Sequence, residues 1–357
     1  MVVVVEADAE HLLGPGPAEL FFPDSCQCVA HRPIFAQPKR SDVSASLRLL
    51  EDANGALSAK RSDVLAVDGH QHFWDPATLP LPWMTAAQAV IDRPFGPGQL
   101  APLMRTAGVE ATILVQAACL DADTDSMFDH AARYEWIAAV VAWVPLDDPD
   151  RADERLDELA AEPKLRGIRH LIHDEEDPHW ILQSSVLESL ELLEQRGLIL
   201  ELPVVFPRHL GDVPELARAF PQLRIVIDHL GKPPLGRDTF GRWAKELATA
   251  AENPNVAAKI SGLNTATTAH DWDAAALRPA VQVAVDAFGP DRLLCGSDWP
   301  VALLNGDYDR VWRETRRVVE LVAPANAEAV LAGTARRLYE LDRVPVHVQA
   351  KDEDGAD

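Results

Sequence analysis

Short apolar runs alternate with longer amphipathic stretches through most of this chain, and no other feature of the sequence constrains the fold as much. The first run begins at Val64 and the last ends at Ser297. The runs are rich in β-branched residues, as strands are. The intervening stretches carry apolar residues three and four positions apart, for example Val186, Leu190 and Leu193, as amphipathic helices do. This order predicts repeated βα units, in which helices cover a parallel sheet.

The runs number eight, which is the strand count that closes a (β/α)8 or TIM barrel. They cover residues 64–68, 111–116, 137–144, 165–171, 198–202, 224–229, 256–261 and 292–297. Helices are expected over residues 151–161, 185–196, 213–220, 237–251, 274–288 and 307–322, and two short ones over 325–331 and 335–341 are expected to close the barrel. We therefore predict an α/β fold with one (β/α)8 barrel over residues 63–342.

Two flanking segments lack these periodic patterns. Prolines and glycines interrupt residues 1–62, so we predict an irregular, mobile extension there. Within it, Cys26, Cys28 and His31 resemble half of a zinc site, but no second ligand pair follows, and we interpret the thiols as incidental. Residues 343–357 are predicted to form an acidic, solvated tail.

The charge and the cysteine content limit the classes of partner. The chain has 33 Lys and Arg against 56 Asp and Glu, a net charge of -23, which disfavours nucleic acid and anionic membranes. No apolar run approaches the roughly 20 residues of a membrane span, and the first residues lack a basic leader. Four cysteines do not make a disulfide scaffold. We expect a cytoplasmic protein that binds a small molecule. Whether it forms a homo-oligomer stays open.

Polar residues at the strand ends indicate where the chemistry lies, because the reacting groups of such barrels sit at the C-terminal ends of strands. His70 and His72 follow the first run, Glu201 lies on the fifth, His229 ends the sixth and Asp298 follows the eighth. His70 and His72 are two residues apart on a strand, so they can face the same ion. Two imidazoles and a carboxylate from Glu201 or Asp298 would make a catalytic zinc set, which lowers the pKa of bound water to about 7.

Four ordered motifs carry a family resemblance. They are Val-Asp-Gly-His-Gln-His-Phe-Trp-Asp-Pro at 67–76, Ile-Val-Ile-Asp-His-Leu-Gly-Lys-Pro at 225–233, Val-Ala-Ala-Lys-Ile-Ser-Gly-Leu at 256–263 and Asp-Arg-Leu-Leu-Cys-Gly-Ser-Asp-Trp-Pro at 291–300. Together they resemble the sugar-lactonase branch of the amidohydrolase superfamily, which includes L-fuconolactonases and L-rhamnonolactonases. The likeness runs from Val64 to about Leu341.

The resemblance implies a role for each matching residue. His70 and His72 match the metal pair of the first strand, Glu201 a ligand that some members place on the fifth, His229 the histidine of the sixth, and Asp298 the carboxylate that handles the water proton and can also bind metal. The fourth run offers no lysine that could bridge two metals. We therefore expect one divalent ion, with zinc the first choice. Related pyrone lactonases work without a metal, so a metal-free site stays open as well.

The resemblance and the residues together indicate hydrolysis of a cyclic ester such as an L-fucono- or L-rhamnono-lactone. Asp298 would accept a proton from water, and His229 with the His70 and His72 site would polarise the lactone carbonyl. We expect Arg169, Trp74 and Trp299 to contact the substrate and interpret Lys232, in a Gly-Lys-Pro turn, as structural.

Two other functions stay open. A metal-dependent decarboxylase of the same superfamily would need a cationic pocket for a carboxylate, and a non-catalytic barrel would only bind sugar. The acidity of the barrel favours a neutral lactone over a strongly anionic substrate, although Arg169 could reverse this locally.

Overall fold

The structure is a computed structural model that describes residues 64–341. The predicted extension over residues 1–62, with its Cys26, Cys28 and His31, lies outside the described residues, and so does the predicted acidic tail over residues 343–357. Among the helices of residues 64–341, none combines the length and the apolar character that a bilayer crossing needs.

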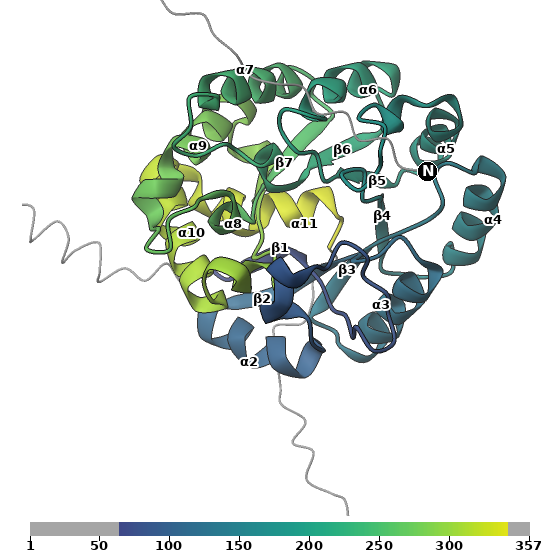
Figure 1. Cartoon of the computed structure of the whole chain (residues 1–357), viewed down its shortest axis with the longest axis horizontal. Helices are drawn as coiled ribbons and strands as arrows, with labels where there is room; N and C mark the ends of the chain where they lie inside the picture. Colours follow the sequence, from purple (N-terminus) through teal and green to yellow (C-terminus); the bar gives the residue numbers. More distant parts are fainter. Residues whose placement is uncertain (1–63, 342–357) are drawn as a thin grey trace, which may run out of the picture. The chain divides into compact units, whose positions relative to one another are not determined.

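Eight parallel strands form one sheet in the order in which they occur along the chain, which confirms the predicted (β/α)8 barrel. Figure 1 shows the strands at the centre and the helices around them. The strands are β1 (Ala66–Gln71), β2 (Val109–Val115), β3 (Ile137–Ala142), β4 (Leu165–Arg169), β5 (Ile199–Leu202), β6 (Arg224–Ile227), β7 (Val256–Ile260) and β8 (Leu293–Cys295).

The helices lie between and after the strands, as the alternating pattern predicts. The α-helices are α2 (Pro97–Ala107), α3 (Asp121–Arg133), α4 (Pro149–Leu159), α5 (Ser184–Gln195), α6 (Val213–Ala219), α7 (Phe240–Ala251), α8 (Leu263–Ala266), α9 (Ala274–Phe288), α10 (Tyr308–Val322) and α11 (Thr334–Leu338). Short 3-10 or π turns are η1 (Ala86–Ile91), η2 (Trp180–Leu182), η3 (Leu210–Asp212), η4 (Asp228–Gly231), η5 (Pro290–Arg292), η6 (Val301–Asn305), η7 (Pro324–Asn326) and η8 (Ala329–Gly333).

The observed elements differ from the predicted ones mainly at their ends. The first strand was predicted to end at Asp68, but β1 runs on to Gln71, so His70 lies within the strand. The helix predicted from Arg151 begins at Pro149, because the Asp148 side chain accepts a hydrogen bond from the Arg151 N–H at 3.2 Å and proline suits the first turn.

The prediction omitted the two longer helices α2 and α3, as well as the four-residue α8. Pro102 interrupts the helical signal of α2. The helix α3 begins with the polar sequence Asp-Ala-Asp-Thr-Asp-Ser and so has few apolar positions to reveal its period. In both cases packing against the barrel outweighs a weak local signal.

The barrel closes between β1 and β8 through backbone contacts at their C-terminal ends. The Asp298 N–H donates to the His70 carbonyl and the His72 N–H donates to the Trp299 carbonyl, each at 2.8 Å. Glycines on both sides allow this approach. A Cβ on Gly69 would lie 2.7 Å from the Cys295 carbonyl oxygen, and a Cβ on Gly296 would lie 2.7 Å from the His70 Cβ. We call this contact between β1 and β8 the seam, and it requires glycine at both positions.

We expect Gly69→Ala and Gly296→Ala each to lower the free energy of unfolding by about 1–3 kcal/mol, because the added methyl group overpacks the seam. Urea denaturation followed by circular dichroism measures the change. The matched control is Gly98→Ala in α2, where an added Cβ meets nothing within 4 Å. Seam variants as stable as that control would contradict this account of closure.

The end of the barrel opposite the strand C-termini is filled by apolar side chains. Inward-facing residues of the strands, such as Val67 and Ile113, pack in one cluster with Ala335, Tyr339 and Leu341. The segment that contains α11 thus covers this end, as expected of the second short helix. The first short helix appears instead as the η7 and η8 turns. The barrel interior is therefore accessible from the other end, where the strands finish.

Candidate functional site

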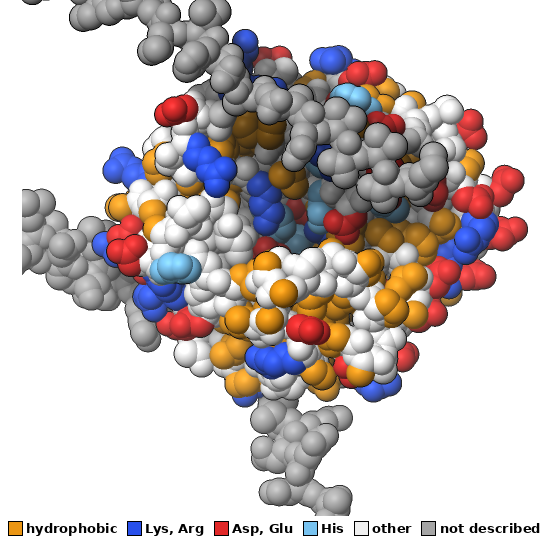
Figure 2. Space-filling model, viewed as in Figure 1, with side chains coloured by type: hydrophobic (Ala, Val, Ile, Leu, Met, Phe, Trp, Pro, Cys, Tyr) orange, Lys and Arg blue, Asp and Glu red, His pale blue; other side chains and the backbone are white. Residues whose placement is uncertain are grey.

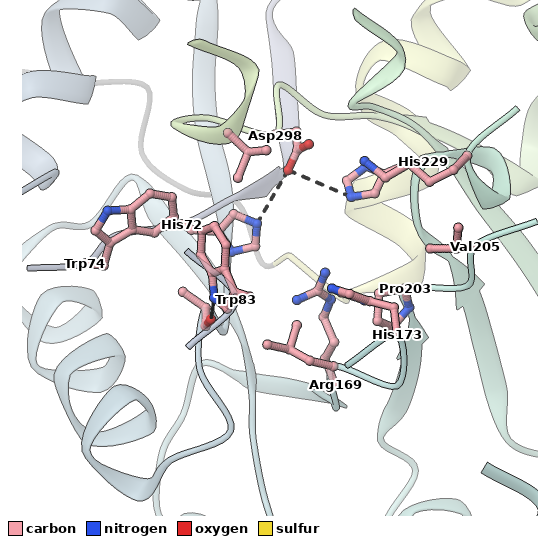
Figure 3. Close-up of a pocket in the computed structure, with 13 residues that line it drawn as sticks. His72, Trp74, Trp83, Arg169, His173, Pro203, Val205, His229 and Asp298 are labelled. Carbon is pink, nitrogen blue, oxygen red and sulfur yellow. Dashed lines mark hydrogen bonds and ion pairs between the residues drawn. The ribbon is translucent and has the colours of Figure 1, made fainter. Parts of the chain in front are cut away.

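The residues expected at the strand ends of β1, β6 and β8 converge on one carboxylate oxygen. Asp298 Oδ1 lies 3.7 Å from His70 Nε2, 3.6 Å from His72 Nε2 and 3.8 Å from His229 Nε2. All four side chains are buried. Figure 3 shows His72 and His229 pointing toward Asp298 from different segments of the chain. We call these four residues the Asp298 cluster.

The backbone of the Asp298 cluster includes two residues in the left-handed region. His229 has φ of 54° and Asp298 has φ of 60°. Residues other than glycine rarely adopt this conformation, and each costs of order 1–3 kcal/mol when the surrounding structure enforces it. Strand β6 ends at Ile227 rather than at the predicted His229, and the turn η4 then carries His229 to the cluster. Such backbone is common where side-chain direction matters more than stability.

Each histidine of the cluster has a second contact through its other ring nitrogen. His72 Nδ1 lies 2.8 Å from the Val115 carbonyl, His229 Nδ1 lies 2.9 Å from Ser261 Oγ, and His70 Nδ1 lies 3.2 Å from an oxygen of Asp228. A carbonyl only accepts, so the Nδ1–H of His72 donates to Val115, and Nε2 is the nitrogen that faces Asp298. Hydrogen bonds like those of His72 and His229 orient imidazoles that bind metals.

The protonation states leave the cluster rich in acceptors. Burial lowers the pKa of His229 to about 3 and lowers the pKa of His70 well below its ordinary value. Burial alone would raise the pKa of Asp298, but the electrostatic interaction with His229, a hydrogen bond with His72 and the nearby Lys232 hold that pKa below its ordinary value. At neutral pH the imidazoles of His70 and His229 are therefore neutral and the Asp298 carboxylate is ionised.

These ligand atoms fit a divalent cation. His70 Nε2 is buried and has no hydrogen-bond partner among the described residues. Ligands of a tetrahedral zinc ion with bonds of about 2.0–2.2 Å are about 3.3–3.6 Å apart, close to the observed separations around Asp298 Oδ1. His70, His229 and Asp298 offer ligand atoms within 4.8 Å of one another. Nitrogen and carboxylate ligands in this arrangement suit zinc.

Glu201 takes part in a different set of contacts. Its Oε2 accepts a hydrogen bond from Lys259 Nζ and its Oε1 accepts one from the Tyr339 hydroxyl, both at 2.5 Å. Its distance to His70 Nδ1 is 3.9 Å. Both Glu201 oxygens are thus occupied by donors of the chain, and the structure does not bring Glu201 into the Asp298 cluster.

Lys259 is a residue that our interpretation of the sequence missed. It lies on β7, has no exposed surface, and contacts Glu201, Asp228 and His70. The signal was present in the run Val-Ala-Ala-Lys-Ile, because a lysine inside an apolar strand is almost never buried without a partner.

A cavity of about 170 Å³ opens over the Asp298 cluster. Figure 2 shows this hollow at the centre of the face, with histidine and charged side chains in it. Arg169 and Trp74 line the cavity, and so do Trp83 and His173. Trp299 is 2% exposed, packs edge to face against Phe73 and Phe95, and is not among the lining residues.

Lys232 also lines the cavity, although the sequence suggested a structural lysine. Its backbone is left-handed, with φ of 57°. Within residues 64–341, no side chain or carbonyl makes a hydrogen bond or ion pair with its ammonium group. Its charge acts instead on Asp298, where it contributes to the lowered pKa. Burial lowers the pKa of Lys232, while Asp298 and Asp228 raise it. Lys232 therefore adds to the cavity a cation that no hydrogen bond or ion pair within residues 64–341 engages.

Gly262 supports the Asp298 cluster by having no side chain. Its φ is +57°, and a Cβ at this position would lie 2.7 Å from Asp298 Oδ2 and 2.7 Å from His229 Nδ1. We expect Gly262→Ala to lower kcat by about tenfold, because the added methyl group displaces the reacting groups from their aligned positions. Steady-state kinetics on the substrate proposed below measures this effect.

Gly197→Ala is the matched control, since Gly197 has φ of +66° but no atom within 4 Å of an added Cβ. It shares the backbone strain without the contact, so kcat should stay at the wild-type value. Equal kcat values in the two variants would show that Gly262 is needed only for its left-handed backbone and not for the space beside Asp298 and His229.

Comparison with known proteins adds independent information. The sequence profile of the amidohydrolase family matches residues 67–341. The chain is 37% identical over 282 residues to an L-fucono-1,5-lactonase of Burkholderia ambifaria, which covers 78% of this chain and 96% of the relative. A crystal structure of an amidohydrolase from Burkholderia multivorans with bound HEPES has 36% identity and a TM-score of 0.73, covering 78% of this chain and 100% of that one. Another from the same organism, with bound zinc, has 35% identity and a TM-score of 0.71 over the same shares.

These matches extend over the whole barrel. The residues matched by the family profile include all four members of the Asp298 cluster and both lysines described above. The agreement between sequence, architecture and site geometry leads to one assignment: this chain belongs to the amidohydrolase family.

Proposed function

We propose that the protein hydrolyses a sugar-acid lactone, such as an L-fucono- or L-rhamnono-lactone or a related aldonolactone. The observation that carries this proposal is the position of Asp298, whose ionised carboxylate is surrounded by three imidazoles at the base of a cavity. The similarity to a relative named as an L-fucono-1,5-lactonase supports the choice of substrate class.

In the proposed reaction, Asp298 is the catalytic base and then the catalytic acid. Its carboxylate accepts a proton as the oxygen of a water molecule bonds to the lactone carbonyl carbon. When the tetrahedral species collapses, the bond between that carbon and the ring oxygen breaks, and Asp298 returns the proton to the departing oxygen. The product is an open-chain hydroxy acid. In a site without an ion, His229, whose Nε2 lies 3.8 Å from Asp298 Oδ1, holds the reacting carbonyl or the water.

A divalent ion at this site would be held by His70, His72, His229 and Asp298, with zinc the best match to these ligands. When bound, such an ion supplies carbonyl polarisation and lowers the pKa of bound water. Glu201 is not part of this proposed ligand set, because Lys259 and Tyr339 occupy its oxygens. The side chain of His229 takes its place.

The cavity walls fit the two sides of a sugar ring. Trp74 and Trp83 offer apolar faces of the kind that pack against carbon-bound hydrogens. Arg169 and Lys232 also line the cavity and offer donors for hydroxyl or carbonyl oxygens. The Arg169 Nε donates to Asp228 at 2.8 Å and one terminal nitrogen donates to the Gln116 carbonyl at 3.1 Å, so its planar group is held in place. Trp299, packed behind this wall, would support it rather than touch the substrate.

A panel of aldonolactones, followed by pH-indicator absorbance against spontaneous opening, tests the proposal. We expect accelerated opening of at least one L-configured lactone. Parallel samples treated with a chelator show whether the activity needs an ion. Release of CO2 from aromatic acids without lactone opening would favour the decarboxylase alternative, and binding of lactones without turnover would favour a sugar-binding barrel.

A further inference from the structure

The described residues contain two groups of side chains that could hold a metal, and they share His70. One comprises His70, His229 and Asp298, and the other comprises His70, Glu201 and Asp228. The groups differ in one respect. The second already surrounds a cation of the chain itself, the ammonium of Lys259.

The contacts of Lys259 resemble those of a coordinated ion. Its Nζ lies 2.5 Å from Glu201 Oε2, 3.3 Å from Asp228 Oδ1 and 3.1 Å from His70 Nδ1, and these are the residues of the second group. Lys259, Glu201, Asp228 and His70 have no exposed surface. A lysine at this depth is retained only where its charge is matched.

We propose that Lys259 is a built-in cation that takes the place of a second metal ion, so that the barrel binds one divalent ion rather than two. Lys259 is also a positioning residue. It holds Asp228, whose Oδ1 lies 3.2 Å from His70 Nδ1, and in this way it directs His70 Nε2 toward the Asp298 cluster.

The balance of charges supports this division. Glu201 and Asp228 carry two negative charges, and Lys259 and Arg169 carry two positive charges, with Arg169 Nε bonded to the second Asp228 oxygen at 2.8 Å. Both oxygens of Glu201 face donors, as an ionised carboxylate requires. The buried network is therefore neutral without a metal.

Removal of the ammonium should convert the second group into a metal site. Lys259→Met retains a side chain of similar length but leaves Glu201 and Asp228 without their cation. A divalent ion such as Zn²⁺ can then supply the missing charge, with oxygen and imidazole ligands that suit it. The inference about Lys259 concerns the second group alone. Only the expectation of one divalent ion in the Asp298 cluster rests on the proposed function.

The experiment counts bound zinc. Wild-type protein, Lys259→Met, Lys259→Arg and the double variant Lys259→Met/Glu201→Gln are stripped with a chelator, incubated with excess Zn²⁺, desalted and analysed for metal per chain. We expect one more zinc ion in Lys259→Met than in the wild type. Lys259→Arg keeps the charge and should bind as the wild type does, and the double variant loses a carboxylate ligand and should gain none.

Thermal unfolding with and without Zn²⁺ provides a second measurement. Zinc should raise the Tm of Lys259→Met more than that of the wild type, because a ligand that binds only the folded state stabilises it by mass action. An unchanged zinc count in folded Lys259→Met would overturn the proposal. So would a Lys259→Met protein that stays unfolded at every Zn²⁺ concentration while the double variant folds. Lactone hydrolysis enters neither measurement, so failure of the proposed activity would be seen separately.

Discussion

Asp298→Asn is expected to lower kcat for lactone opening by about 10³-fold, the largest effect of any single substitution considered for this protein. Asparagine has nearly the same shape as aspartate, but it cannot accept the water proton or return it to the ring oxygen. It also removes the negative charge that the three surrounding imidazoles face at 3.6, 3.7 and 3.8 Å. Steady-state kinetics on the best lactone of the panel measures the loss.

The control for this substitution is Asp271→Asn, which changes an exposed carboxylate in the same way. It should leave kcat unchanged. Circular dichroism and thermal unfolding establish that Asp298→Asn is folded. A folded Asp298→Asn enzyme that retains a tenth or more of the wild-type kcat would exclude Asp298 as the proton acceptor.

Lys232→Met is expected to lower kcat/KM by about 10²-fold, because a preorganised donor facing developing negative charge contributes about this much in other enzymes. The Lys232 ammonium lines the cavity, and within residues 64–341 no hydrogen bond or ion pair engages it. Its charge is therefore available to an oxygen of the substrate. A loss carried mainly by kcat would indicate contact with the reacting carbonyl, and a loss carried mainly by KM would indicate contact with a sugar hydroxyl.

Lys245→Met is the control, since Lys245 is an exposed lysine on α7. Its replacement makes the same change in net charge and should not alter kcat/KM. If both lysine variants behave alike, the effect of Lys232 comes from the overall field of the protein rather than from contact in the cavity. Wild-type kinetics in folded Lys232→Met would contradict contact with the substrate and would leave Lys232 with the structural role that its turn suggests.

The site illustrates how far local sequence patterns extend. His70 and His72 could be placed on one face because side chains two apart on a strand point the same way. The structure confirms that they meet Asp298. The sequence could not show that Glu201, also on a strand, would pair with Lys259 and Tyr339. Those contacts join residues 58 and 138 positions apart, and no period within one strand contains such information.

The net charge of the chain likewise does not predict the charge around the cavity. The net charge of -23 favoured a neutral substrate over an anionic one. The cavity wall nevertheless carries Arg169 and Lys232. A total charge averages over the surface, whereas a ligand in a cavity responds mainly to the few groups within several ångströms, since water and salt screen the rest. The composition therefore describes the surface of this barrel and not its binding site.

By itself, the sequence determined the class of fold, the order of its strands and the four motifs from which the site is made, because apolar periodicity and strand-end polarity are encoded in neighbouring residues. Only the tertiary structure decided which members of those motifs touch. Barrel closure brings Asp298 to His70, and β7 inserts Lys259 between Glu201 and Asp228. Buried charges take the partners that the three-dimensional packing provides, and distance along the chain does not limit that choice.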